Sequence, residues 1–272
     1  MSTAARPVVK RGSTVMSRTF LVDTWWVAWR EMKHFVGERV RVIMILVQPF
    51  IWLVLMGNLF QRMAMLPGFP ARSYLDYMAP GVVTMVTLFG GIFGGMTIVW
   101  DRRLGYLNKL LAAPIARSAV VSGKMLAIGI QTSVQAAIIF GIAMFMGVTF
   151  KTGVLGAVMV IALAAILSTV FAGISLSFGA VITSHEALMA VMNFFTMPLM
   201  FTSNAMMPLS FMPGWLQTLA KINPLSYAIN PMRSLFLTGW RPGELIQGVI
   251  ILSLVSLALG VLATRLFKRS LA

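Results

Sequence analysis

Long uncharged stretches of apolar residues constrain this chain more than any other feature. Six of them lie at about residues 42–60, 78–99, 125–150, 154–182, 187–207 and 245–263, separated by short polar clusters. The apolar core of a bilayer is about 30 Å thick and needs ~20 apolar residues for one helical crossing. Only 11% of the residues are charged, against about 25% in soluble domains. We therefore predict an all-α membrane protein with six transmembrane helices.

The two ends of the chain are polar, which indicates a single membrane domain between them. Residues 1–20 are basic and rich in Ser and Thr, and they lack the apolar stretch and cleavage site of a secretory signal. Residues 265–272 carry three further cations. We expect a flexible cytoplasmic tail at 1–20, a six-helix transmembrane domain at 21–264 and a second cytoplasmic tail at 265–272.

Residues 22–41 have the pattern of an N-terminal amphipathic helix in the membrane interface. Apolar residues recur at close to helical spacing, and charged residues fill the positions between them. Trp25, Trp26 and Trp29 suit the headgroup layer, while the cations suit its wet side. The pattern fits a simple anchor for the first span as well as it fits a helix that transmits motion.

The distribution of Lys and Arg predicts the orientation of the spans. With both termini inside, the cytoplasmic segments hold 16 of these residues and the external segments hold 6. Cations are generally in excess on the cytoplasmic side of membrane proteins. We therefore predict a multi-pass protein of the inner or plasma membrane with both termini cytoplasmic. The net charge of +15 then serves contact with anionic lipids and not nucleic acid, because the cations are dispersed between apolar segments.

The segment from residue 208 to 244 is unusual because it combines five prolines with many Leu, Phe, Met and Trp residues. A loop in water would not be so apolar, and a full span would not contain so many helix breakers. We predict two short helices that enter the outer leaflet and return, forming a re-entrant external segment before the last span.

Small residues are paired in the second predicted span, at positions that lie one helical turn apart. Such pairs allow a neighbouring helix to approach closely. They fit packing within one subunit and also fit a seam between two subunits; the residues are Gly90, Gly91, Gly94 and Gly95.

Several kinds of chemistry are disfavoured by what the sequence lacks. It has no cysteine and only two histidines, which do not form a metal-binding or catalytic pattern. No acidic residue lies in the middle of an apolar stretch, so a carrier driven by an ion gradient and a membrane-embedded enzyme are both disfavoured. The acids are Asp23, Glu31, Glu38, Asp76, Asp101, Glu186 and Glu244.

Energy for active transport would have to come from a different polypeptide. The sequence contains no G-x-x-x-x-G-K-[ST] phosphate-binding loop, so the chain does not itself bind ATP in the usual way. Residues 100–124 form the one internal polar segment long enough to receive a partner on the cytoplasmic side. Its leucines have the spacing of a short amphipathic helix, although a solvated basic loop is the alternative; they are Leu104, Leu107, Leu110 and Leu111.

Three stretches of this sequence resemble the ABC-2 type transporter permeases, especially the branch of daunorubicin-resistance and nodulation-factor exporters. Residues 101–115, DRRLGYLNKLLAAPI, resemble the coupling segment of that family. The other two stretches are FTSNAMMPL at 201–209, continuing to MPGWL at 212–216, and NPLSYA at 223–228 with Arg233 following. The family usually has an acidic residue beside the basic ones just before the coupling glycine, whereas Arg102 and Arg103 precede Leu104 here.

The resemblance implies a permease that forms a pair, with a second copy of this chain expected, and that binds two copies of a separate ATP-binding subunit. It implies no cofactor on this chain, with ATP and Mg on the partner. The residues expected to receive the partner's movement are Arg102, Arg103, Gly105, Leu107, Lys109, Leu110, Leu111, Pro114, His185 and Glu186. An external gate is expected in the re-entrant segment, at Pro208, Trp215, Asn223, Pro224 and Tyr227.

Only the composition of the spans gives information on the cargo. They contain Met, Phe and Leu with a few amides. Flexible Met-rich surfaces accommodate varied apolar ligands, which favours an amphiphilic, drug-like, lipid or glycan-linked cargo; most of these Met and Phe side chains would equally suit contact with lipid or neighbouring helices. An ATPase-independent channel or carrier is the alternative to an ATP-driven exporter. The amides are Gln48, Asn58, Gln131, Gln135 and Asn193.

Overall fold

The structure is a computed structural model that describes residues 13–106 and 115–270. Within these ranges every regular element is a helix. In chain order the helices are α1 (Ser13–Gly37), α2 (Arg39–Leu59), η1 (Gln61–Met65), α3 (Tyr74–Gly95), α4 (Thr97–Arg103), α6 (Arg117–Phe145), α7 (Gly153–Val181), α8 (His185–Phe201), η2 (Leu209–Phe211), α9 (Gly214–Ile222), α10 (Pro224–Leu237) and α11 (Pro242–Arg269).

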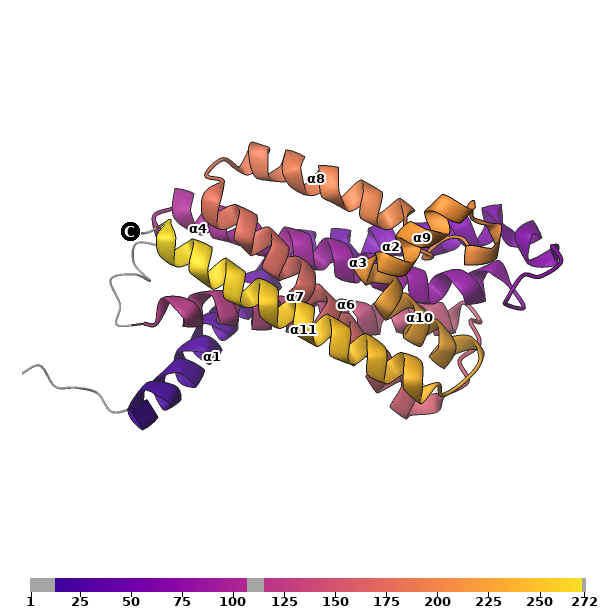
Figure 1. Cartoon of the computed structure of the whole chain (residues 1–272), viewed down its shortest axis with the longest axis horizontal. Coiled ribbons are helices and arrows are strands. Elements are labelled where there is room, and N and C mark those ends of the chain that lie inside the picture. Colours follow the sequence, from indigo (N-terminus) through magenta and orange to yellow (C-terminus); the bar gives the residue numbers. More distant parts are fainter. Residues whose placement is uncertain (1–12, 107–114, 271–272) are drawn as a thin grey trace, which may run out of the picture.

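The long helices run back and forth between two ends of an elongated bundle (Figure 1). We call the end that holds the start of α1 and the end of α11 the terminal end. The opposite end holds η1, α9, α10 and the start of α11, and we call it the distal end (Figure 1). Alternation of this kind is what a chain that repeatedly crosses a bilayer requires.

Five helical segments of the described chain are long and apolar enough to cross a membrane. They are Val42–Leu59, Tyr74–Arg103, Arg117–Phe145, Gly153–Val181 and Pro242–Arg269. The prediction of an all-α membrane protein is therefore confirmed, and five of the six predicted spans correspond to candidate spans of the structure. The fifth of the six predicted spans, at 187–207, coincides with α8, which has 17 residues and ends at Phe201.

Helix α3 lies at the centre of the bundle, and its small residues explain why. A methyl group added at Gly91 would lie 2.6 Å from the Ser168 carbonyl oxygen, and one at Gly95 would lie 2.6 Å from Ser175 Cβ, both on α7. On the neighbouring face, a methyl group at Gly94 would lie 2.6 Å from Ile128 Cγ1 on α6. The paired small residues of the sequence are thus used for packing within the chain.

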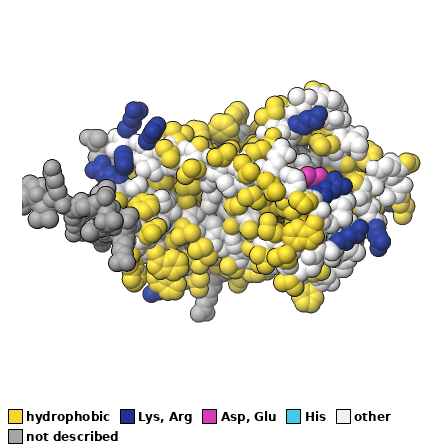
Figure 2. All heavy atoms as spheres, turned by 60° about the horizontal axis from the view of Figure 1, so that its bottom comes forward, with side chains coloured by type: hydrophobic (Ala, Val, Ile, Leu, Met, Phe, Trp, Pro, Cys, Tyr) yellow, Lys and Arg dark blue, Asp and Glu magenta, His cyan; other side chains and the backbone are white. Residues whose placement is uncertain are grey.

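Hydrophobic side chains remain exposed along the outer helices, as a surface in contact with lipid requires. On the face seen in Figure 2 they cover the middle of the molecule, while Lys and Arg gather towards its two ends. Helices α2, α8 and α11 contribute many of the large exposed side chains, among them Ile43, Leu55, Phe194, Phe201, Leu254 and Leu257. This distribution fits a bilayer around the waist and headgroups or water at both ends.

Helix α1 differs in detail from the interfacial helix expected at 22–41. The tryptophans Trp25, Trp26 and Trp29 are exposed as expected, but the opposite face is not wet, because Val27 is buried against Gly123 of α6. The chain breaks at Glu38, so the expected single helix becomes the end of α1 and the start of α2. Helix α6 begins at Arg117, eight residues before the predicted third span, which brings the buried Lys124 into a helix.

Candidate functional site

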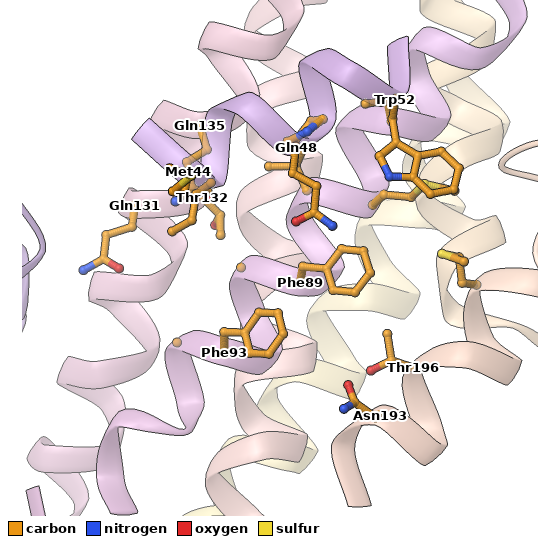
Figure 3. Close-up of a pocket in the computed structure, with 18 of the residues that line it drawn as sticks. Met44, Gln48, Trp52, Phe89, Phe93, Gln131, Thr132, Gln135, Asn193 and Thr196 are labelled. Carbon is orange, nitrogen blue, oxygen red and sulfur yellow. The ribbon is translucent and has the colours of Figure 1, made fainter. Parts of the chain in front are cut away.

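A cavity of about 500 Å³ lies between α2, α3, α6 and α8. Figure 3 shows Phe89 and Phe93 of α3 between side chains of α2, such as Gln48, and side chains of α8, such as Asn193. The two phenyl rings of α3 stack with their centroids 6.1 Å apart. Since α2 and α8 bury few of their side chains, two of the helices that border the cavity are loosely packed.

The lining of this cavity is apolar with a few amides and hydroxyls and contains no charged side chain. Four of the five amide side chains singled out in the sequence line it, namely Gln48, Gln131, Gln135 and Asn193. The fifth, Asn58, instead donates to the Val54 carbonyl oxygen at 2.7 Å. Such a lining can hold an apolar or aromatic ligand and offer it hydrogen bonds without an ionic contact.

Gln135 is the most distinctive polar group of the lining. Its side chain is only 5% exposed, and its Oε1 atom has no hydrogen-bond partner among the described residues. Most buried side-chain acceptors in proteins are paired, so an unpaired one beside a cavity is an acceptor that a ligand or water can satisfy. Its neighbour Gln131, one turn away, is held by a hydrogen bond to the Glu31 carbonyl oxygen at 3.4 Å.

At the terminal end, four charged side chains from three helices form a cluster. Lys124 of α6 lies 2.9 Å from Glu31 of α1 and 2.6 Å from Asp101 of α4. Arg30 of α1 lies 2.9 Å from Asp101 and 3.3 Å from Glu31. We call these four residues the charged cluster. Because Lys124 is only 1% exposed, the two carboxylates stabilise a cation that would otherwise be very costly to bury.

Two residues of the charged cluster, Asp101 and Lys124, lie within the segment 100–124 that is predicted to receive a partner. Asp101 is followed by Arg102 and Arg103, and the Arg30 guanidinium also lies 3.5 Å from the centre of the Tyr106 ring. Gly105 ends α4 with a positive φ of 66°, a conformation that favours glycine. Five of the predicted partner-contacting residues, Leu107, Lys109, Leu110, Leu111 and Pro114, lie outside the described residues.

The structure brings the two separate parts of the predicted coupling site together. Arg103 Nη2 lies 2.9 Å from Glu186 Oε2, and the rings of Trp100 and His185 lie 5.0 Å apart. Arg102 donates to the Ala180 carbonyl oxygen at 3.0 Å, at the carboxyl end of α7 where a cation is favourable. The turn between α7 and α8 is therefore joined to the end of α4 by three side-chain contacts.

Glu186 is exposed, and its carboxyl group has a shifted pKa. A hydrogen bond from its own backbone amide and the hydrogen bond from Arg103 lower the pKa of its carboxyl group below the ordinary value. The carboxylate is thus charged over the physiological range and available both to Arg103 and to the first turn of α8.

At the distal end, the residues predicted to form an external gate have different roles. Asn223 is buried; its Nδ2 donates to the Leu199 carbonyl oxygen at 2.7 Å, and its Oδ1 accepts from the Leu225 amide at 2.9 Å. It therefore caps both the end of α8 and the start of α10, where Pro224 is the first helical residue. Pro208 is buried, Trp215 on α9 is 67% exposed, and Tyr227 is half-buried. The two short helices predicted in this segment are present as α9 and α10.

Sequence reasoning missed the charged cluster and the unpaired amide of Gln135. The cluster joins residues up to 93 positions apart, and no local pattern marks such pairs. One signal was available: Lys124 is followed directly by apolar residues of the third span, where an unpaired cation would be costly.

The sequence is similar to several known proteins. The sequence matches the family described as ABC-2 type transporter over residues 22–237. Its relatives include the transport permease ycf38 of Porphyra purpurea, 31% identical over 218 residues that span 79% of this chain and 73% of the relative. The probable doxorubicin resistance ABC transporter permease protein DrrC of Mycobacterium tuberculosis is 24% identical over 92% of this chain and 91% of the relative. The daunorubicin resistance ABC transporter permease protein DrrB1 of Streptomyces coeruleorubidus is 26% identical over 85% of this chain and 80% of the relative.

Proposed function

The chain belongs to the ABC-2 type transporter family and is a transmembrane subunit of an ABC exporter, and we propose that it works as one of two permeases driven by separate ATP-binding subunits. The observation that carries this proposal is the uncharged cavity inside a bundle of apolar helices. A carrier driven by an ion gradient needs a titratable or ion-binding group within the bilayer, and the lining of this cavity has no titratable group among the described residues. The driving force then enters at the end of the bundle that carries the charged residues.

We propose that α8 is the sixth span, although it has 17 residues. It runs from the terminal end to the distal end like a crossing helix (Figure 1), and most of its exposed side chains are apolar. The turn at 202–208 and the capped start of α10 extend its path at the distal end. The terminal end would then be cytoplasmic, with tails at 1–20 and 265–272 flanking one membrane domain at 21–264. Helices α9 and α10 would form the re-entrant segment on the outside.

The coupling site follows from the contacts at the terminal end. We propose that the ATP-binding subunits press on residues 100–124 and on the turn at His185 and Glu186, which Arg103 joins to α4. The charged cluster would carry this movement to α1 and α6, because Lys124 and Asp101 tie three helices at one point. Replacing Leu110 and Leu111 by Asp should weaken binding of the ATPase without disturbing membrane insertion.

We propose that the cavity between α2, α3, α6 and α8 receives the cargo. Its aromatic and methionine side chains suit a drug-like, lipid or glycan-linked amphiphile, and the drug-resistance names of two relatives support the first of these. The exposed apolar faces of α2 and α8 border this cavity, and a second copy of the chain against them would enclose it. Closing the partner subunits around ATP would then empty the cavity towards the distal end, past Trp215 and Asn223.

Reconstitution of the permease with and without its ATPase tests this proposal. Cargo transport in vesicles should require the ATPase, ATP and Mg, and it should stop when ATP is depleted. Transport by the permease alone, undiminished by removal of ATP, would favour the ATPase-independent channel or carrier. Candidate cargoes can be screened first by their stimulation of ATP hydrolysis in the assembled complex.

A further inference from the structure

A second cavity lies at the distal end and differs in chemistry from the first. Its volume is about 570 Å³, and it is bordered by α9, α10 and the start of α11. It shares no lining residue with the uncharged cavity, and its lining includes Lys221, Arg233 and Arg241 against the single acid Glu244. Figure 2 shows Lys and Arg side chains with an acidic group among them towards one end of the molecule. The distal cavity is therefore cationic where the first is neutral.

Arg233 of α10 is the central group of the distal cavity. One face of its guanidinium lies 3.8 Å from the centre of the Tyr77 ring. Its Nη2 donates to the carbonyl oxygens of Asn204 at 2.8 Å and Ala205 at 3.3 Å. Its Nε is buried and has no hydrogen-bond partner within the described ranges 13–106 and 115–270. The protein thus fixes the guanidinium group through Nη2, while the Nε–H group remains a donor without a partner among the described residues.

No carboxylate of the described residues forms an ion pair with Arg233. The nearby acid Glu244 is 3.0 Å from Arg241, and the buried Asp76 at the same end accepts hydrogen bonds from the backbone amide and hydroxyl of Thr149. Arg233 is half-buried, and charges that are partly withdrawn from water are normally paired, because removing an ion from water has a free-energy cost. Two neutral carbonyl oxygens offset only part of that cost.

A second polar group of the cavity also lacks a partner. The Ser226 side chain is 5% exposed, and its hydroxyl group makes no hydrogen bond to any described residue. Like Arg233, Ser226 belongs to α10 and lines the distal cavity. Lys221, at the end of α9, is exposed and forms no ion pair with the described residues. The cavity therefore combines a preorganised guanidinium, a free hydroxyl donor and a second cation.

We infer that the distal cavity binds a phosphate group, with Arg233 as the main ligand and Ser226 and Lys221 as supporting donors. Arginine presents its N–H groups in a planar fork that matches the oxygens of phosphate, and such charge-assisted bonds are about twice as strong as neutral ones. The phosphate belongs to a lipid headgroup or is free in solution. In the proposed topology the cavity lies at the level of the outer headgroups, but the binding chemistry itself does not depend on transport.

Thermal unfolding of the purified full-length permease in a neutral detergent tests this inference, with intrinsic tryptophan fluorescence as the signal. One arm adds sodium phosphate at constant ionic strength, and the other adds dihexanoyl phosphatidic acid, whose headgroup is a bare phosphate. We expect at least one ligand to raise Tm by about 2 °C or more. A rise in both arms assigns the site to phosphate itself, and a rise with the lipid alone assigns it to a headgroup.

The variants decide whether the distal cavity causes the effect. Arg233→Gln should weaken apparent binding by at least ~10-fold, because a charge-assisted hydrogen bond is lost. Arg62→Gln, which removes an exposed arginine of η1 outside the cavity, should bind like the native protein. Since Arg233 also holds two carbonyl groups, Arg233→Gln could fail to fold; the double variant Lys221→Gln, Ser226→Ala then replaces it and should weaken binding too.

The inference fails if neither ligand raises the Tm of the native protein. It also fails if Arg62→Gln weakens binding as much as the cavity variants do. Retention of the full Tm rise in Arg233→Gln, or in the double variant where Arg233→Gln does not fold, would overturn it equally.

Discussion

Lys124 Nζ of α6 lies 2.6 Å from Asp101 Oδ2 at the end of α4, and this pair joins the third candidate span to the segment that precedes the coupling residues. Glu31 of α1 completes the contact with Lys124 at 2.9 Å. Three helices that are distant in sequence therefore meet at one nearly inaccessible ammonium group.

Removing this ammonium group should destabilise the protein strongly. Lys124→Met leaves the mostly buried carboxylates of Glu31 and Asp101 with Arg30 as their remaining shared cation, which should cost about 3 kcal/mol of unfolding free energy. Lys151→Met, at an exposed cation in the turn before α7, should cost far less. Thermal unfolding in detergent measures both. Adding Asp101→Asn to Lys124→Met should restore part of the loss, and an equal loss in both single variants would contradict the role of the cluster.

The contact between Arg103 and Glu186 should matter for coupling more than for stability. Both side chains are largely exposed, so Arg103→Gln should change Tm little. In the proposed mechanism, however, it should lower cargo-stimulated ATP hydrolysis by the complex about as much as Glu186→Gln does. Exchange of the two charges, Arg103→Glu with Glu186→Arg, should recover part of the activity. Additive losses in the double neutral variant would show that the residues act separately.

The carboxyl pKa of Glu186 gives a direct measurement of the same contact. The pKa is lowered in the folded protein, so the stabilising contribution is present above the ordinary value and is lost as the pH falls through the lowered one. Arg103→Gln should raise this pKa only part of the way, because the backbone amide of Glu186 still donates. The four glutamates of the chain can be followed by NMR after selective carboxyl labelling. No rise in Arg103→Gln would contradict the contact.

Gln135 should affect cargo recognition without supporting the fold. Gln135→Leu removes a buried acceptor that no described residue pairs with, so Tm should stay the same or rise. A cargo that donates a hydrogen bond to this amide should lose about 10-fold in apparent affinity, measured as half-maximal stimulation of ATP hydrolysis. The matched control is Asn58→Leu, an amide of α2 outside the cavity. If both variants leave the affinity unchanged, the cavity does not hold cargo through Gln135.

Single cysteines can test the proposed topology because the native chain contains none. Lys151→Cys and Lys221→Cys should react with a membrane-impermeant maleimide added to intact cells. Lys268→Cys, near the end of α11, should react only after the membrane is opened. All three positions are exposed, so accessibility within the protein does not limit the reaction. Labelling of Lys268→Cys from outside would show that the orientation is the opposite of the one proposed.

The helical framework could be predicted because membrane crossing imposes length and composition on each segment. The close packing of α3 was likewise readable from Gly91 and Gly95, since one helical turn separates them and both face α7. The two short helices α9 and α10 followed from prolines in an apolar segment. In each case the cause is local, within a few residues of its effect.

The features that sequence reasoning missed depend on which helices become neighbours. Lys124 was expected to lie between two spans, because a cation inside a span is unfavourable. Instead, the carboxylates of Glu31 and Asp101 on other helices neutralise its charge. On α1, Arg30 was expected to face water, but it belongs to the same charged cluster and contacts Asp101. Nor could the sequence show that Arg103 reaches Glu186 across 83 positions.

The single amide of Asn223 holds the last turn of α8 and the first turn of α10 at the same time. A hinge at this point would have to break hydrogen bonds on both sides of the side chain at once. The outer part of the bundle should therefore swing as one rigid body, and any opening to the exterior must find its pivot elsewhere, in the stretch before α11 where Gly239 adopts a positive φ of 110°.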